Sequence, residues 1–63
     1  MSFRGEEIAE AVRDIVVGGG EEDIELDELC SRVERNLGFS LTPEQRDLVA
    51  TVLNTCRMEV AFP

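Results

Sequence analysis

Apolar and polar residues recur along this chain with the period of an α-helix, in three segments separated by short polar or glycine-rich stretches. In the first segment, residues 5–17, the apolar positions are three or four residues apart and predict one inward face. They are Ile8, Ala11, Val12 and Ile15. Glu6 and Glu7 lie in the first turn, where the helix dipole favours negative charge. The triple glycine that follows predicts the end of this helix, with Gly18 as a left-handed cap.

The second segment, residues 26–37, has the same period. Its inward positions are Leu26, Leu29, Cys30, Val33 and Leu37. Glu28 and Arg32 are correctly oriented i, i+4 partners on the outer face. Gly38 predicts the end of the helix, and Phe39 is expected to pack back on it.

The third segment has the clearest start signal. Thr42 at the N-cap, Pro43 at the first helical position and Gln45 after them form a predicted capping box. The inward stripe consists of Val49, Val52, Leu53 and Cys56, with Leu48 at its edge. The helix is predicted over residues 43–57, and residues 59–63 are expected to be a short extended piece or disordered.

Three amphipathic helices joined by short loops predict an all-α fold, a compact three-helix domain that spans residues 1–63 as a single unit. The linker between the second and third helices, residues 38–41, has helix-turn-helix spacing, so these two helices are predicted to form a helix-turn-helix-like pair. The acidic connection before the second helix holds one apolar residue, Ile24, that is expected to point inward. A chain of 63 residues buries only about 60% of its unfolded surface, so a partner or a second copy would add stability.

Charge is distributed unevenly along the chain. The stretch from Glu6 to Glu28 holds ten of the fourteen acidic residues and one base, Arg13, which gives it a formal charge of −9. The residues from 29 onward are neutral overall, and the whole chain has a net charge of −8. Such a charge disfavours a polyphosphate ligand, so nucleic acid is not an expected ligand. It favours a basic partner, a metal ion or simple solubility.

The chain lacks residues and patterns that several classes of protein require, so these classes are disfavoured. There is no His, no phosphate-binding glycine loop and no spacing that indicates a buried carboxylate pair, so an enzyme is not expected. Cys30 and Cys56 fall on predicted apolar faces and are expected to be small core residues rather than a disulfide or zinc ligands. The acidic residues of the 21–28 stretch lack the spacing of an EF-hand, so no metal or other cofactor is expected.

The sequence also gives an expectation for location. No apolar run approaches the roughly 20 residues that span a bilayer. The N-terminal residues MSFRGEEIAE are acidic where a secretory signal is basic and then apolar. The predicted location is therefore intracellular, in the cytoplasm or the nucleus, without a membrane partner.

Two stretches between Glu6 and Cys56 carry a resemblance to a known family. They are EEIAEAVRDIV in the first helix and DELCSRVERNLGFSLTPEQRDLVATVL across the other two. The matching positions are Ile8, Val12, Arg13, Ile15, Leu29, Val33, Glu34, Leu37, Gly38, Phe39, Leu41, Val49, Val52 and Leu53. In this pattern the chain resembles the DEK C-terminal domain family, whose fold is a compact helical bundle similar to winged-helix domains, used for DNA binding, self-association and protein contacts. The resemblance implies a winged-helix-like architecture, here without a clear wing. The chain differs in a longer first loop, residues 18–22, and in lacking the basic surface that DNA binding uses.

The first candidate partner-binding surface is a row of carboxylates. Glu6, Glu10 and Asp14 are four residues apart and lie on one outer side of the first helix, with Glu7 beside them. Like charges at this spacing cost about a few tenths of a kcal/mol per pair, and a basic partner would relieve that repulsion. An ordinary solvated face is the alternative.

The second candidate surface is the outward face of the third helix, which consists of Asp47, Thr51 and Asn54. The mild polarity of Ala50, Thr51, Asn54 and Thr55 suits a protein contact or a dimer seam, and a plain solvated helix is the alternative. Arg46 and Arg57 flank this face, so a weak DNA-binding domain is one further hypothesis.

These observations favour a non-enzymatic protein-interaction module that docks a basic protein surface or associates with a second copy of itself. An acidic inhibitor that mimics DNA and occupies a nucleic-acid-binding protein is the first alternative. The weak DNA-binding domain is the second alternative. Catalytic, cofactor-binding and metal-ligating residues are not assigned.

Overall fold

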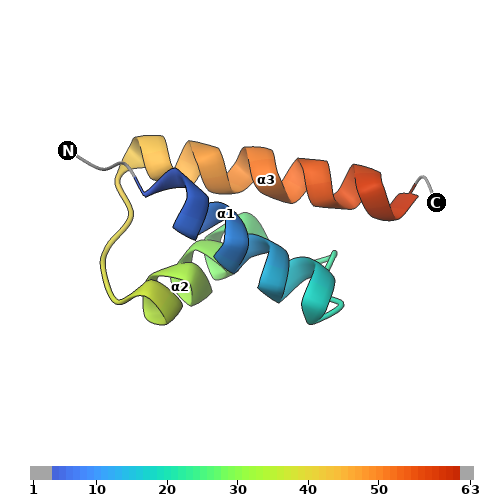
Figure 1. The fold of residues 1–63 in the computed structure, drawn as a ribbon, viewed down its shortest axis with the longest axis horizontal. Helices are drawn as coiled ribbons and strands as arrows, with labels where there is room; N and C mark the ends of the chain where they lie inside the picture. Colours follow the sequence, from blue (N-terminus) through green and yellow to red (C-terminus); the bar gives the residue numbers. More distant parts are fainter. Residues whose placement is uncertain (1–3, 62–63) are drawn as a thin grey trace.

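The computed structural model describes residues 4–61, with side chains up to Glu59. It contains the helices α1 (Gly5–Arg13), α2 (Leu26–Leu37) and α3 (Pro43–Ala61), and a π-helical turn, η1 (Asp14–Gly18), that continues α1. No strand occurs within residues 4–61. The predicted all-α, three-helix fold is therefore confirmed. Figure 1 shows α3 along the longest dimension of the molecule, with α1 and α2 together on one side of it.

The core is formed where α1 meets both other helices, and aliphatic side chains dominate it. Its buried residues are Ile8, Ala11, Val12, Val16, Ile24, Leu29, Cys30, Val33, Val49, Leu53 and Cys56. Ile8, Val12 and Val16 are completely buried on α1 and η1. Because these side chains are shared between α2 and α3, the α1 stripe joins the domain into one core.

The first helix differs from the prediction in its last turn. Residues 5–17 were expected to be one regular α-helix with Ile15 inward, whereas Val16 is fully buried and Ile15 is half-buried. The π-helical turn explains this difference, because an i→i+5 turn holds one residue more than an α-helical turn and moves the inward position from 15 to 16. The predicted cap is also wrong: Gly18 is part of η1, and Gly20 has the positive φ of 67°.

The loop between η1 and α2 is held at three points. Ile24 is buried, as predicted. Arg57 of α3 donates from Nε to the Glu22 carbonyl at 2.8 Å and from Nη2 to the Ile24 carbonyl at 3.0 Å. Arg32 of α2 forms an ion pair with Glu21. These contacts fasten the acidic loop to both following helices.

Helix α2 has the predicted bounds, and most of its predicted details are confirmed. Leu29, Cys30 and Val33 are buried, and Arg32 Nη2 lies 3.0 Å from Glu28 Oε2. Gly38 ends the helix with a φ of 83°, and its N–H donates to the Glu34 carbonyl at 2.7 Å.

Two apolar residues, Leu26 at the start of α2 and Phe39 just after its end, were predicted to pack inward. Phe39 packs against the core, and the Arg4 guanidinium carbon lies 4.9 Å from the centre of its ring. The prediction for Leu26 is wrong, because this side chain is 37% exposed. As the first residue of the helix, Leu26 lies before the turns that α1 and α3 cover.

Helix α3 begins as predicted and ends later than predicted. The Gln45 N–H donates to Thr42 Oγ1 at 3.2 Å, and the Thr42 N–H donates to Gln45 Oε1 at 2.8 Å, which confirms the capping box. The helix continues to Ala61 instead of ending at residue 57. An ion pair from Arg13 of α1 to Glu59, at 3.2 Å, supports its last turns. Of the predicted tail, residues 62–63 lie outside the described residues.

The glycines at the end of η1 give a matched test of this fold. A Cβ added to Gly19 would lie 2.6 Å from the Ile15 carbonyl oxygen, whereas one added to Gly18 meets nothing within 4 Å. We expect Gly18→Ala to raise the free energy of unfolding by about 0.4–1 kcal/mol, because alanine restricts the unfolded chain. Gly19→Ala should lower it by more than about 1 kcal/mol. Urea denaturation of both variants measures the difference, and equal effects would contradict the π-helical turn.

Candidate partner-binding site

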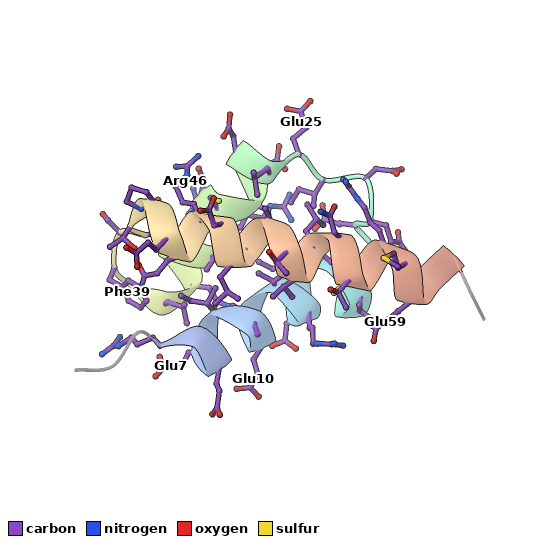
Figure 2. All side chains as sticks on the ribbon, turned by 90° about the horizontal axis from the view of Figure 1, so that it is seen from above. Glu7, Glu10, Glu25, Phe39, Arg46 and Glu59 are labelled. Atoms are coloured by element: carbon purple, nitrogen blue, oxygen red, sulfur yellow. The ribbon has the colours of Figure 1, made fainter. Side chains whose placement is uncertain are left out.

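The predicted carboxylate row lies on the exposed side of α1 and η1. Glu6, Glu7, Glu10 and Asp14 are all exposed. In Figure 2, Glu7 and Glu10 project from α1 away from α3. All four predicted residues are therefore accessible to a partner.

Three of the four carboxylates line a shallow groove between α1 and α2. The groove has a volume of about 230 Å³ and is lined by Glu7, Glu10, Ala11, Asp14, Asn36 and Leu37. Glu6 is not among these lining residues. Ala11 is buried and Leu37 is half-buried, so the carboxylates surround a partly apolar surface. A surface of this kind binds a side chain that is apolar along its stem and cationic at its tip.

The arginines leave this groove with an excess of negative charge. Within residues 4–61, ion pairs engage Glu7 with Arg4 at 3.9 Å, but neither Glu10 nor Asp14 takes part in one. The nearest base on the same helix, Arg13, is paired with Glu59 of α3. Glu10 and Asp14 are thus carboxylates whose charge no arginine of the described chain neutralises.

Sequence reasoning missed two residues of this groove. Asn36 was not singled out, and Leu37 was assigned to the inward stripe of the second helix. Both belong to the site because the last turn of α2 crosses beside α1. That crossing depends on tertiary packing, and no residue pattern in either helix predicts which residues of α2 meet the carboxylate row.

The acidic groove is one end of a longer valley between α1 and α2, and the other end of this valley is basic. Ile15, Arg32, Arg35 and Asn36 line a second depression of about 570 Å³, which shares Asn36 with the acidic groove. Arg32 is paired with Glu21 and Glu28, but no ion pair within the described part of the chain engages Arg35. The valley therefore changes from acidic to basic along its length.

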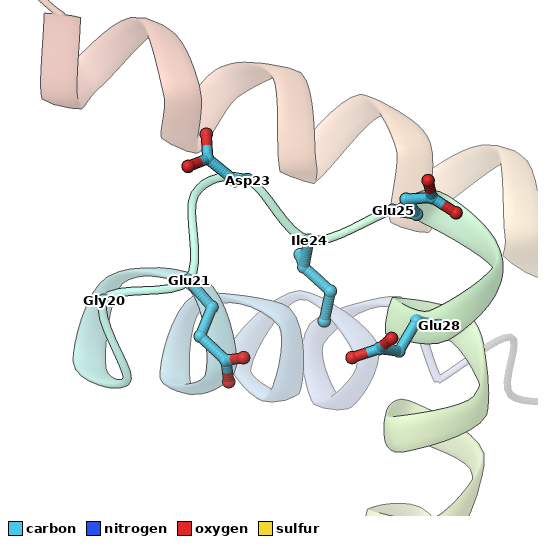
Figure 3. A pocket seen from close by; sticks show the side chains of 6 residues that line it. All are labelled: Gly20, Glu21, Asp23, Ile24, Glu25 and Glu28. Carbon is cyan, nitrogen blue, oxygen red and sulfur yellow. The ribbon is translucent and has the colours of Figure 1, made fainter.

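A third depression lies under the loop before α2 and is acidic. Its volume is about 600 Å³, and it is lined by Gly20, Glu21, Asp23, Ile24, Glu25 and Glu28. Figure 3 shows Glu21 and Asp23 pointing to opposite sides of the loop. Arg32 compensates Glu21 and Glu28. Among the described residues, no three His, Cys, Asp or Glu side chains are placed to share a metal ion.

The second predicted surface, the outward face of α3, is also exposed. Asp47, Thr51 and Asn54 are exposed, and Figure 2 shows α3 in front of the other helices. Thr51 Oγ1 donates to the Asp47 carbonyl at 3.1 Å, and Thr55 Oγ1 donates to the Thr51 carbonyl at 3.0 Å. The two hydroxyls are thereby satisfied within the helix. This face is separate from the α1–α2 groove.

Both cysteines are part of the core, as predicted. Cys30 and Cys56 are buried and free, with no disulfide between them. Burial raises the pKa of both thiols above the ordinary value of 9.0, and the opposing effects of Arg46 on Cys30 and Arg13 on Cys56 are smaller. At neutral pH both side chains are therefore protonated thiols, the form that is a poor nucleophile.

Comparison with known proteins adds no relative to this description. No protein-family profile, curated protein or solved structure matches the chain. The resemblance to the DEK C-terminal domain family stays a prediction. In the described part of the chain, no helix is long and apolar enough to cross a membrane.

The raised thiol pKa values predict a loss of stability in alkali. The chain has no Lys and no Tyr, so the two cysteines are the side chains expected to titrate between pH 8 and 11. Above pH 9 the unfolded thiols ionise while the folded ones keep their protons, so the free energy of unfolding falls as pH rises. The slope is up to about 1.4 kcal/mol per thiol per pH unit.

Urea denaturation at a series of alkaline pH values measures this slope. A Cys30→Ala/Cys56→Ala variant is the control, because it is less stable at every pH but lacks both titrating groups. A wild-type slope equal to that of the control would show that burial does not shift the thiol pKa values.

Proposed function

We propose that this chain is a non-enzymatic protein-interaction module that binds a basic segment of another protein in the groove between α1 and α2. The observation that carries the proposal is the pair Glu10 and Asp14, which flank a partly apolar groove without an internal cation.

Electrostatics supports a cationic ligand. The net charge of −8 attracts basic proteins over a range of about 10 Å at moderate salt. At contact, each Lys or Arg placed against Glu10 or Asp14 forms a surface ion pair worth about 0.2–1 kcal/mol. Several such pairs are needed for useful affinity, so the expected ligand is a segment with more than one basic residue.

The apolar lining supports a protein segment over a nucleic acid. Leu37 and Ala11 offer contact to the methylene stem of a Lys or Arg side chain, whose cationic tip then reaches the carboxylates. A DNA phosphate would be repelled by the same carboxylates. A DNA-mimicking inhibitor needs only the negative charges, so the apolar lining favours the interaction module over that alternative.

The arginines near α3 support the same choice. Arg46 pairs with Asp27 at 3.0 Å, and Arg57 donates to the loop carbonyls of Glu22 and Ile24. Arg46 is therefore paired with an acid of the domain and Arg57 is held against the acidic loop, so the two do not form a basic surface of the kind that binds a phosphate backbone. The resemblance to the DEK C-terminal domain family adds support, since that family uses this fold for protein contacts as well as for DNA.

The non-enzymatic part of the proposal is supported by the state of the thiols. Cys30 and Cys56 are the only candidate sulfur nucleophiles in the chain, and burial keeps them protonated. The groove itself presents exposed carboxylates with an amide and two apolar side chains. This arrangement suits recognition of charge and shape.

A labelled amphipathic peptide with Lys residues three and four apart provides a direct test of the groove. We expect the Glu10→Gln/Asp14→Asn variant to bind this peptide at least about fivefold more weakly than the wild type in fluorescence anisotropy. The matched control is Glu22→Gln/Asp23→Asn, which removes the same charge from the loop. Its affinity should change less than about twofold.

Two outcomes would contradict the proposal. If both double variants weaken binding equally, the peptide responds to net charge rather than to the groove. If duplex DNA binds the wild type tightly and saturably, the domain is a nucleic-acid-binding protein. Circular dichroism of each variant shows whether the helices are intact.

A further inference from the structure

A run of nine residues in α3 carries no Asp, Glu, Lys or Arg, although 32% of the chain is charged. This run extends from Leu48 to Cys56, and its exposed members are Thr51, Asn54 and Thr55. Since the Thr51 hydroxyl donates to a carbonyl of its own helix, its methyl group contributes most of what Thr51 presents to a partner. Thr55 lies about 100° around the helix from Asn54 and is at the flank of this face. One turn further on, Met58 is 62% exposed. The outward side of α3 is thus the least charged exposed face described here.

The two ends of this face have opposite charges. Asp47 lies before the uncharged run, is exposed and makes no ion pair within residues 4–61. Arg57 lies after the run and is also exposed. Ten residues separate them, which is about 15 Å along the helix axis and places both on the same half of its circumference. Half-way between them lie the small Ala50 and the amide of Asn54.

This pattern is self-complementary. If two α3 helices pack antiparallel about a two-fold axis near Ala50 and Asn54, Asp47 of each copy approaches Arg57 of the other. Two of the five N–H donors of Arg57 stay on the Glu22 and Ile24 carbonyls. Because these acceptors are neutral, they do not neutralise its positive charge, which can attract the carboxylate of the second copy. Small side chains at the axis allow the helices to approach closely.

We propose that the outward face of α3 is a homodimer interface that binds the same face of a second copy in this antiparallel arrangement. A second copy is the partner that the charges select. Each copy has a net charge of −8, so two copies attract each other only where both faces lack excess charge and their end charges alternate. The proposal is independent of the basic-segment groove.

The size of the outward face of α3 sets the expected strength of dimerisation. Helix α3 has 19 residues, about 28 Å of helix, along a molecule whose longest extent is 37 Å. A standard interface buries about 800 Å² per partner, and one helix face with its flanks lies at or below that area. We therefore expect a reversible dimer with a Kd between about 10 μM and 1 mM.

Dimerisation would make the domain bivalent. Because α1 and α2 lie behind α3 in Figure 2, a second copy on the outward face leaves the valley between them open. The dimer then presents two acidic grooves. A partner with two basic segments would bind it more tightly than one groove alone allows.

Sedimentation equilibrium of the full chain tests the interface. The wild type should dimerise, and its Kd should fall as salt rises from about 0.05 to 0.5 M, because salt screens the net repulsion between the copies. Asn54→Glu places added carboxylates at the axis and should raise the Kd at least about tenfold. Thr55→Glu is the matched control, since it adds the same charge to the flank of the helix, and should raise the Kd less than about threefold.

A second pair of variants tests the arrangement of charges. Glu44 and Asp47 are both exposed acids in the first turns of α3 without an ion pair in the described chain. We expect Asp47→Asn to weaken the dimer about two- to fivefold, because it removes the approach to Arg57 of the second copy. Glu44→Gln should leave the dimer unchanged or tighten it, since it only reduces repulsion.

A wild type that remains monomeric at about 1 mM and high salt would overturn the proposal. So would equal effects of Asn54→Glu and Thr55→Glu, or a tighter dimer in Asp47→Asn. Binding of the Lys-rich peptide to the Asn54→Glu variant is measured alongside. Because the groove is remote from the outward face of α3, the affinity of one groove for the peptide should not change in this variant. The peptide measurement therefore separates failure of the proposed dimer from failure of the proposed groove.

Discussion

The arrangement of this domain depends on the burial of one apolar stripe on α1 and η1. Ile8, Val12 and Val16 are fully buried there, and both α2 and α3 pack against that stripe. In so small a chain no second core can replace it. Once this side of α1 faces inward, Glu6, Glu7, Glu10 and Asp14 must face solvent. The acidic surface is therefore fixed in place by the same packing that stabilises the fold.

Features that depend on neighbouring residues could be predicted from the sequence. The capping box of Thr42 and Gln45 and the glycine end at Gly38 belong to this class, because capping is decided within a few residues. Features that depend on tertiary contacts could not. The π-helical turn that exchanges Ile15 for Val16 follows from packing against α3, and the last turns of α3 are supported by Arg13 of a distant helix. The groove was predicted only in part, since Asn36 joins the carboxylates through the crossing of α1 and α2.

The positions of the arginines decide which acidic side chains remain available to bind a partner. Arg13, Arg32, Arg46 and Arg57 all hold one segment of the domain against another through ion pairs or carbonyl contacts. Their ion pairs engage Glu21, Asp27, Glu28 and Glu59 but leave Glu10 and Asp14 in the groove uncompensated. The outward face of α3 has the opposite character, with few charges. We propose that these two faces serve different partners, a basic segment at the groove and a second copy at α3, whose binding should respond to salt in opposite directions.

The most direct measurement of the groove as a partner-binding site is a titration of the chain with the Lys-rich peptide, followed by amide NMR. We expect the largest shifts at the residues that line the groove, which are Glu7, Glu10, Ala11, Asp14, Asn36 and Leu37. Residues 21–25, which are equally acidic but fastened by Arg32 and Arg57, should shift little. Shifts spread over all acidic segments, or centred on residues 21–25, would contradict a defined groove and leave only non-specific attraction by net charge.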